Sequence, residues 1–277
     1  MNQTNLYVNA IGTICLIAVG IYSVRTMFED KSAPPCSRTY EGGVQFPFEN
    51  QSGAPFSPIE LQARAGGGER NVLENAKVVQ QSDAPAHSVM EVRVNGKEPE
   101  GGIESAWNAS KLRTAKSACR AYSVWLPGDF AFADLGTVPG LYGGSKLGPE
   151  DQPKDGTGFA ARVRWRDQGA SELFAQLTGG PDGVGIAIPT NNAALASGRW
   201  VRVEQEVVLN DPGQSNGQLR LWLDGHLVAE SSEVELRRDS SIVLAGVAGD
   251  IGYGGKRPEG TAKDVFIRVS PFEISWK

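Results

Sequence analysis

The sequence predicts an all-β protein of the sandwich or jelly-roll type, preceded by one N-terminal transmembrane helix. Three observations lead to this prediction. Glycine makes up 34 of the 277 residues and proline another 16, a composition that suits turns better than helices, because an interior glycine costs a helix about 1 kcal/mol. Short runs of alternating apolar and polar residues recur along the chain with turn signals between them. A single long apolar stretch lies near the N-terminus.

The N-terminal stretch is the candidate membrane segment. Residues 6–24 contain no charged side chain, and the first one in the chain is Arg25. About 20 apolar residues are enough to cross a bilayer as a helix, and Tyr7 and Tyr22 lie near the two ends, where interfacial aromatic residues are favoured. A cleaved signal peptide is the alternative, although the basic region that begins such peptides is missing. We therefore expect residues 1–24 to form a membrane anchor.

The rest of the chain is expected to be a linker at residues 25–40 and a β-domain at 41–277. Residues 41–85 are only weakly periodic, so loops with a short strand or helix are expected there. From residue 88 onward the strand pattern is regular and interrupted by tight turns. The predicted strands are 88–94, 121–126, 159–166, 171–177, 184–188, 200–209, 218–223, 242–247 and 265–269. This many short strands are typical of a sandwich or jelly roll.

The overall charge and the cysteines exclude several classes of function. The formal net charge of −5 argues against nonspecific nucleic-acid binding, which requires a basic surface. The chain has two histidines and no Cys-x-x-Cys pair, so no structural zinc site is expected, and no other metal or cofactor is predicted. Cys15 lies in the apolar stretch. Cys36 and Cys119 form one disulfide if the domain is exported, and the alternative is two unpaired cysteines.

One predicted strand carries an unusual charge pattern. Arg162, Arg164 and Arg166 are two residues apart, so a strand places all three on one face and apolar residues on the other. The residues that share a face in the same way on the next strand are Glu172, Phe174 and Gln176. A hairpin of these strands would present a cationic face that suits an anionic sugar chain, because guanidinium groups pair with carboxylates. The alternative is an ordinary solvated sheet face with cross-strand Arg–Glu pairs.

Several segments, taken in order, resemble the alginate and glucuronan lyases of β-jelly-roll type. The most distinctive is the PGLYGG motif at residues 139–144, and the others are 121–132, 158–166, 171–177, 198–225 and 272–276. The resemblance covers residues 85–277 and implies a concanavalin-like β-jelly-roll sandwich. It also implies a chemistry, since these enzymes cleave uronic-acid polymers by β-elimination. That reaction needs a group that neutralises the carboxylate, a base and an acid.

Only part of the lyase pattern is present when it is carried over residue by residue. The strand arginine of the family corresponds to Arg162, and the tyrosine of its PGLYGG motif corresponds to Tyr142. The position of its usual lysine holds Thr137, and its tyrosine pair falls on Phe174 and Gln176. The resemblance therefore implies that the scaffold is retained and that the usual acid and base are not.

Three interpretations of function follow from these residues. In the first, a membrane-anchored protein with a periplasmic or extracellular domain binds an acidic polysaccharide without conventional catalysis, through Arg162, Arg164, Arg166, Phe174 and Gln176. In the second, the protein is an active lyase, in which Arg162, Arg164 and Gln176 neutralise the carboxylate and Tyr142 or His226 acts as the base. In the third, it is a structural or assembly protein of a glycan synthesis or export system.

Overall fold

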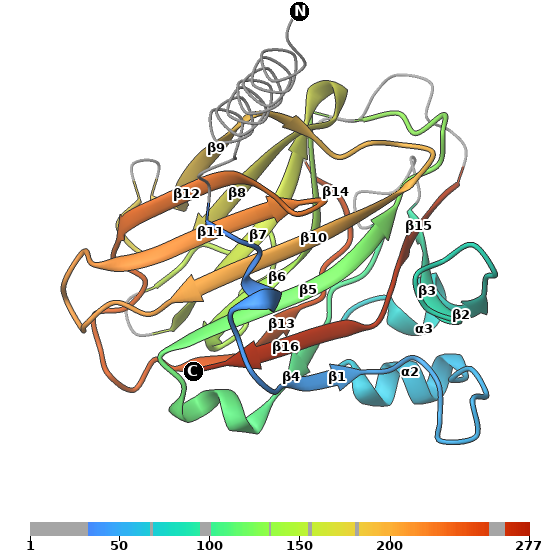
Figure 1. Cartoon of the computed structure of the whole chain (residues 1–277), viewed down its shortest axis with the longest axis horizontal. Coiled ribbons are helices and arrows are strands. Elements are labelled where there is room, and N and C mark those ends of the chain that lie inside the picture. The colour runs from blue at the N-terminus through green and yellow to red at the C-terminus, as the bar shows by residue number, and fades with distance from the viewer. Residues whose placement is uncertain are drawn as a thin grey trace, which may run out of the picture. The chain divides into compact units, whose positions relative to one another are not determined.

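Two antiparallel β-sheets pack face to face in the part of the chain that the structure describes (Figure 1). The computed structural model describes residues 33–66, 69–94, 101–132, 134–154, 157–180, 183–254 and 264–277. The expected membrane anchor at residues 1–24 lies outside these residues. None of the helices that are described is long and apolar enough to span a bilayer. The all-β sandwich prediction is confirmed.

The larger sheet contains nine of the described strands. Seven of them follow one another across the sheet in the order β12, β11, β10, β5, β15, β3 and β2, while β16 pairs with both β5 and β1. Their bounds are β1 (Val44–Phe46), β2 (Ala76–Gln80), β3 (Ser88–Val94), β5 (Ser117–Trp125), β10 (Trp200–Val208), β11 (Gly217–Leu223), β12 (His226–Val234), β15 (Val265–Val269) and β16 (Phe272–Trp276).

The smaller sheet contains seven of the described strands and carries the arginine-rich strand near its centre. Its order is β4, β13, β6, β7, β8 and β9, and β14 pairs with β6. The bounds are β4 (Ala106–Asn108), β6 (Leu135–Gly144), β7 (Gly158–Arg166), β8 (Ala170–Gln176), β9 (Gly185–Ala194), β13 (Leu244–Ala248) and β14 (Gly252–Gly254).

Short helices and 3₁₀ turns lie between or before the strands. They are the α-helices α2 (Pro58–Arg64) and α3 (Val72–Asn75) and the 3₁₀ turns η1 (Cys36–Arg38), η2 (Ser110–Thr114) and η3 (Asp167–Gly169). Helix α2 begins at a capping box, in which the Ser57 hydroxyl accepts from the Glu60 backbone N–H and the Glu60 carboxylate accepts from the Ser57 N–H. Residues 41–85, where loops with a short strand or helix are expected, thus contain both short strands and short helices.

Alternation along β7 and β8 decides which side chains enter the core. Ala161, Val163 and Trp165 are completely buried in the core between the sheets, as are Leu173 and Ala175 of β8. The arginines that alternate with them therefore lie on the outer face of the seven-stranded sheet. The period-2 prediction for this strand is confirmed.

Strand β6 was not predicted from periodicity, because Pro139 and Gly140 interrupt its pattern. The strand keeps its pairing with β7 by a shift in register between Val138 and Leu141. Proline has no N–H to donate, and strand prolines are therefore found at bulges or edges. A Cβ on Gly140 would collide with the carbonyl oxygen of Ala161, so this position requires glycine.

A buried polar cluster of the opposite sheet supports the β6 irregularity. The Gln205 side chain accepts a hydrogen bond from the Leu141 backbone N–H at 3.1 Å and donates one to the Ala161 carbonyl at 2.9 Å. The Tyr122 hydroxyl donates to the Pro139 carbonyl at 3.3 Å. Backbone groups that the bulge leaves unpaired would be costly to bury, so these two side chains replace the missing sheet hydrogen bonds.

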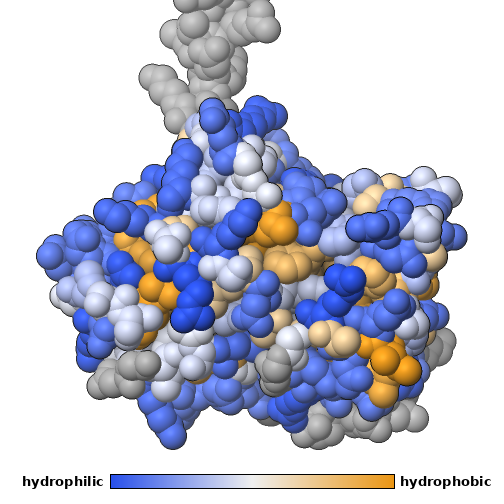
Figure 2. Space-filling view, turned by 90° about the horizontal axis from the view of Figure 1, so that it is seen from below, coloured by the Kyte–Doolittle hydropathy of each residue, from blue (hydrophilic) through white to orange (hydrophobic). Residues whose placement is uncertain are grey.

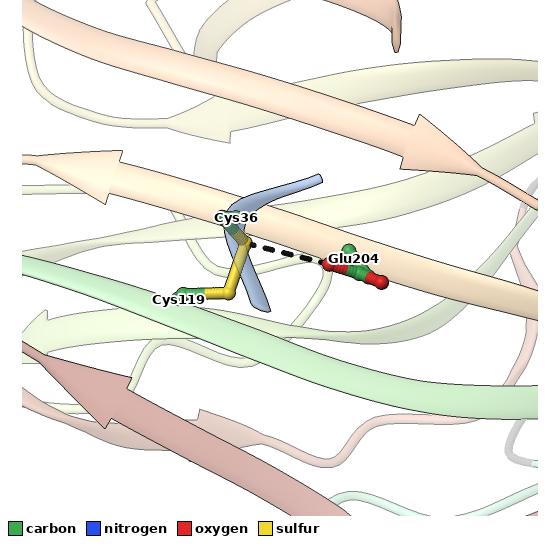
Figure 3. Close-up of side chains that lie close together, drawn as sticks. All are labelled: Cys36, Cys119 and Glu204. Carbon is green, nitrogen blue, oxygen red and sulfur yellow. Dashed lines mark hydrogen bonds between the residues drawn. A yellow bond between two sulfur atoms is a disulfide. The ribbon is translucent and has the colours of Figure 1, made fainter. Parts of the chain in front are cut away.

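The segment at residues 34–40 packs against the nine-stranded sheet. A disulfide joins Cys36 to Cys119 of β5, with an S–S distance of 2.08 Å, so of the two alternatives for these cysteines the disulfide is the one present (Figure 3). The Ser37 N–H donates to the Glu204 carboxylate at 3.0 Å, and the Tyr40 hydroxyl donates to Glu206 at 2.7 Å. A compact unit accordingly begins at Pro34 and extends to the end of the chain, so these residues belong to it and not to a separate linker.

Candidate functional site

Strands β7 and β8 place the predicted site residues side by side on the outer face of the smaller sheet. In the register of the two strands, Arg162 lies opposite Phe174 and Arg164 lies opposite Glu172. The three arginines nevertheless differ in exposure, because the side chains of Arg162, Arg164 and Arg166 are 2%, 13% and 44% exposed. The stripe therefore begins with a buried arginine and ends with one at the surface.

Arg162 is held by the protein through all three of its guanidinium nitrogens. Its Nε and Nη2 atoms contact one carboxylate oxygen of Asp250 at 2.9 and 2.8 Å. Nη1 donates to the Gln176 side-chain oxygen and Nη2 to the carbonyl of Leu147. A buried guanidinium requires such partners, because an unpaired one would be strongly destabilising.

Asp250 connects Arg162 to further charged residues. Its second carboxylate oxygen lies 2.7 Å from Lys146 Nζ and accepts from the Ser105 N–H at 3.1 Å. Lys146 also contacts Glu104 at 3.3 Å, and Glu104 pairs with Arg70 at 3.0 Å. Sequence reasoning missed this chain of alternating charges, because its members come from segments far apart along the chain and no local pattern links them.

A loop at residues 145–154 lies against the two central strands. Gln176 is fully buried, and its side-chain nitrogen donates to the carbonyls of Gly148 at 2.9 Å and Asp151 at 2.5 Å. Arg162 donates to the same loop at Leu147. Arg162 and Gln176, two of the predicted site residues, thus hold this loop in place.

Arg164 and Phe174 form a stacked pair. The guanidinium carbon of Arg164 lies 3.5 Å from the centroid of the Phe174 ring, a cation–π contact. Glu172 binds Arg164 through Nε at 2.7 Å and Nη2 at 2.6 Å, and it also binds Arg166 at 3.0 Å. The cross-strand Arg–Glu pairs of the alternative interpretation are therefore present. Burial lowers the pKa of Arg164, and the charge of Glu172 opposes that shift.

The tyrosine of the PGLYGG motif lies on the same face of the sheet and is buried. Tyr142 is 3% exposed, and its hydroxyl donates to the side-chain oxygen of Asn108. Burial, and to a smaller extent the negative charge of Asp250, raises the pKa of Tyr142 to about 12. Its hydroxyl is consequently protonated at neutral pH. His226 begins β12 of the opposite sheet, so the structure does not bring it to this site.

A hollow of about 380 Å³ opens beside the arginine stripe. Arg162, Arg164 and Phe174 line it, together with Thr137 and Tyr253. Arg166, Gln176 and Tyr142 do not belong to its lining. The remaining charged residues of the lining are Arg70, Glu104, Glu150 and Asp151. The hollow thus combines cations with carboxylates that can accept hydrogen bonds from hydroxyl groups.

The described residues include one group of three that could in principle bind a metal ion. It consists of Cys36, Cys119 and Glu204, all buried (Figure 3). The two sulfur atoms are bonded to each other, whereas cysteine binds a metal ion as a free thiolate. In this state the group does not offer a metal site.

Comparison with known proteins assigns the chain to a family. The model of the polysaccharide lyase 14 family matches residues 75–266. The chain belongs to this family. The match includes β6, β7 and β8 and all of the lining of the hollow except Arg70 and Asn71. No curated protein sequence matches the chain significantly.

Solved structures of lyases have the same fold as this polysaccharide lyase 14 chain. The marine PL-14 alginate lyase from Aplysia kurodai is 16% identical with a TM-score of 0.68, and 86% of this chain and 99% of that one are covered. The alginate lyase vAL-1 from Chlorella virus is 17% identical with a TM-score of 0.65, covering 79% and 97%. The endo-β-1,4-glucuronan lyase from Trichoderma reesei is 14% identical with a TM-score of 0.53, covering 77% and 90%.

Proposed function

We propose that this polysaccharide lyase 14 chain is a membrane-anchored protein that binds an acidic, uronic-acid-containing polysaccharide in the hollow beside Arg164. One observation carries the proposal. Arg164 lines the hollow and uses Nε and Nη2 to bind Glu172, which leaves Nη1 without a protein partner among the described residues. A carboxylate is the natural partner for that nitrogen.

The surroundings of Arg164 favour binding. The Phe174 ring beneath it and the Glu172 carboxylate beside it hold the guanidinium in one orientation, so little rotamer freedom is lost when a ligand binds. Glu104, Glu150 and Asp151 line the same hollow and offer acceptors for sugar hydroxyls. The hollow therefore suits a saccharide that carries both carboxylate and hydroxyl groups.

The positions of the other residues support binding over β-elimination. Arg162 and Gln176, which would neutralise a substrate carboxylate in a lyase, are occupied by Asp250 and by the loop at 145–154. The Tyr142 hydroxyl donates to Asn108, and its pKa of about 12 makes it a poor base at neutral pH. Thr137, at the position of the family's lysine, lines the hollow without offering a base.

The disulfide supports a periplasmic or extracellular location for the domain. Structural disulfides are found mainly in exported proteins, since the cytosol keeps thiols reduced. The bond between Cys36 and Cys119 therefore favours a periplasmic or extracellular domain, with the apolar residues 6–24 as its anchor. The face seen in Figure 2 is mostly hydrophilic, with apolar residues in separate groups, which does not favour a protein-assembly role on that side.

Replacing Arg164 by glutamine is expected to weaken binding of polyuronates about tenfold or more, because a charge-assisted hydrogen bond to the ligand is lost. The measurement is calorimetric titration of the full chain with polymannuronate, polyguluronate and polyglucuronate, and with a neutral glucan as the control ligand. Arg166→Gln is the matched control variant. Arg166 binds the same Glu172 carboxylate but does not line the hollow, so this variant should bind like the wild type.

Two outcomes would contradict the proposal. Equal losses in the two variants would show that the effect comes from Glu172 and not from contact with the ligand. An increase in ultraviolet absorbance on incubation with any of the polyuronates, due to the unsaturated product, would show an active lyase. We expect no such increase from the wild-type chain.

A further inference from the structure

A second hollow lies at the other end of β6. Its volume is about 580 Å³. The polar side chains of its lining are Asn108, Ser110, Arg113, Ser145, Thr157 and Ser241. Five of these six are neutral hydrogen-bonding groups and one is a cation, whereas no aspartate or glutamate among the described residues lines the hollow. The composition differs from that of the first hollow, where carboxylates accompany every arginine.

Sheet pairing fixes the walls of the second hollow. Strand β13 pairs with β4 on one side and with β6 on the other. Beyond the paired residues, the Gly144 N–H donates to the Val243 carbonyl at 2.9 Å, and the Ser145 N–H donates to the Thr157 carbonyl at 2.7 Å. Two of the hydroxyl-bearing residues, Ser145 and Thr157, are therefore held by a backbone hydrogen bond to each other, which favours a preformed site.

Arg113 is the cation of this hollow, and no counter-ion is present for it in the part of the chain that the structure describes. It forms no ion pair or side-chain hydrogen bond with another described residue. The neighbouring Asp239 accepts from the Ser241 N–H at 2.7 Å and is not part of the lining. By contrast, the arginines of the first hollow pair with Glu104, Asp250 and Glu172. None of the described side chains therefore occupies the guanidinium donors of Arg113, which suits the binding of an anionic group.

The two hollows are arranged along one strand. Thr137 lines the first and Gly144 lines the second, and the seven residue steps from one to the other correspond to about 23 Å of extended chain. The hydrogen-bonded pair of Tyr142 and Asn108 lies between these positions, and Asn108 itself lines the second hollow. A ligand that reaches both hollows must therefore be an oligosaccharide of several units.

We propose that the second hollow is a separate subsite for the glycan, in which Arg113 binds an anionic group of the sugar and the surrounding hydroxyls and Asn108 bind its neutral groups. This inference rests on the proposed function, since it assumes that the glycan occupies the first hollow. It adds that recognition of the acidic group depends on Arg113 as well as on Arg164, and that it requires a ligand long enough to span β6.

The test compares Arg113→Gln with Lys111→Gln in the full chain. Both residues lie in η2 and are exposed, but Lys111 does not line the hollow. The probes are a hexamer and a dimer of glucuronic acid and a hexamer in which the carboxyl groups are reduced to alcohols. We expect Arg113→Gln to weaken hexamer binding about tenfold, which corresponds to the loss of one charge-assisted hydrogen bond. The affinity for the dimer and for the reduced hexamer should be the same in Arg113→Gln as in the wild type.

Each other result overturns the inference. If Arg113→Gln binds the hexamer as tightly as the wild type, while Arg164→Gln does not, the proposed function stands and the second subsite is wrong. If Lys111→Gln weakens binding as much as Arg113→Gln, general charge attraction explains both. If the wild type binds none of the polyuronates above and neither acidic oligomer, the proposed function itself fails, and the second subsite fails with it.

Discussion

Replacing Asp250 by asparagine is expected to lower the free energy of unfolding by about 3–5 kcal/mol, the usual cost of removing one partner of a buried ion pair. Asp250 is completely buried and lies 2.8 Å from Arg162 Nη2 and 2.7 Å from Lys146 Nζ. Asparagine keeps the shape of the side chain but leaves two largely buried cations without their shared counter-charge. The measurement is urea unfolding of the full chain.

An exposed ion pair provides the control for Asp250. Glu273 binds Arg202 at 2.9 Å with its side chain 47% exposed, so Glu273→Gln should cost about 1 kcal/mol or less. If Asp250→Asn fails to fold, Lys146→Met offers a milder change, because it removes one cation and leaves the Asp250–Arg162 pair intact. A cost for Asp250→Asn no greater than that of Glu273→Gln would show that the network adds nothing to stability.

Removing the disulfide is expected to lower the free energy of unfolding by a similar amount. The bond between Cys36 and Cys119 closes a loop with a sequence separation of 83 residues, and the loss of chain-entropy stabilisation for a loop of this length is on the order of 4 kcal/mol. The double variant Cys36→Ser, Cys119→Ser should therefore unfold at a lower urea concentration than the wild type. Reduction of the wild type by a dithiol should produce the same shift.

The double variant serves as its own control for reduction. It has no disulfide in the described part of the chain, so adding the dithiol should leave its unfolding curve unchanged. An unfolding curve of the wild type that does not respond to the dithiol would show that the disulfide contributes no stability. A loss limited to residues 34–40, detected as faster hydrogen exchange there with an unchanged global transition, would show that it holds only this segment.

The alternation of apolar and polar residues within single strands predicted much of the fold. Alternation predicted β3 at residues 88–94 with its actual bounds, and it assigned Arg162 and Val163 to opposite faces of β7 before any partner strand was known. These predictions succeed because side-chain direction along a strand has a period of two and depends only on the strand itself. Periodicity missed several strands, among them β12 and β6. In β6, Pro139 and Gly140 break the alternation, and groups from the opposite sheet accommodate them.

The candidate site was predictable in its position but not in its chemistry. The sequence placed Arg164 and Phe174 on one face of neighbouring strands, and both line the hollow. It could not show that Arg164 covers the Phe174 ring, or that Gln176 is used to hold a loop. Whether a polar side chain remains available to a ligand depends on every group that packs against it, and most of those groups come from distant segments.

By itself, the sequence determined the all-β class, the faces of β7 and β8 and the likeness to polysaccharide lyases, because these depend on local period or on short motifs. It left open whether Cys36 and Cys119 are joined, because residues 83 positions apart meet only in the folded chain. Only the tertiary structure decided that Arg162 pairs with Asp250, 88 residues away, and that Arg113 has no counter-ion among the described residues. Ion pairs form between groups that the fold brings within a few ångströms in a medium of low polarity. The sheet pairing and loop positions that set those distances are properties of the folded chain as a whole.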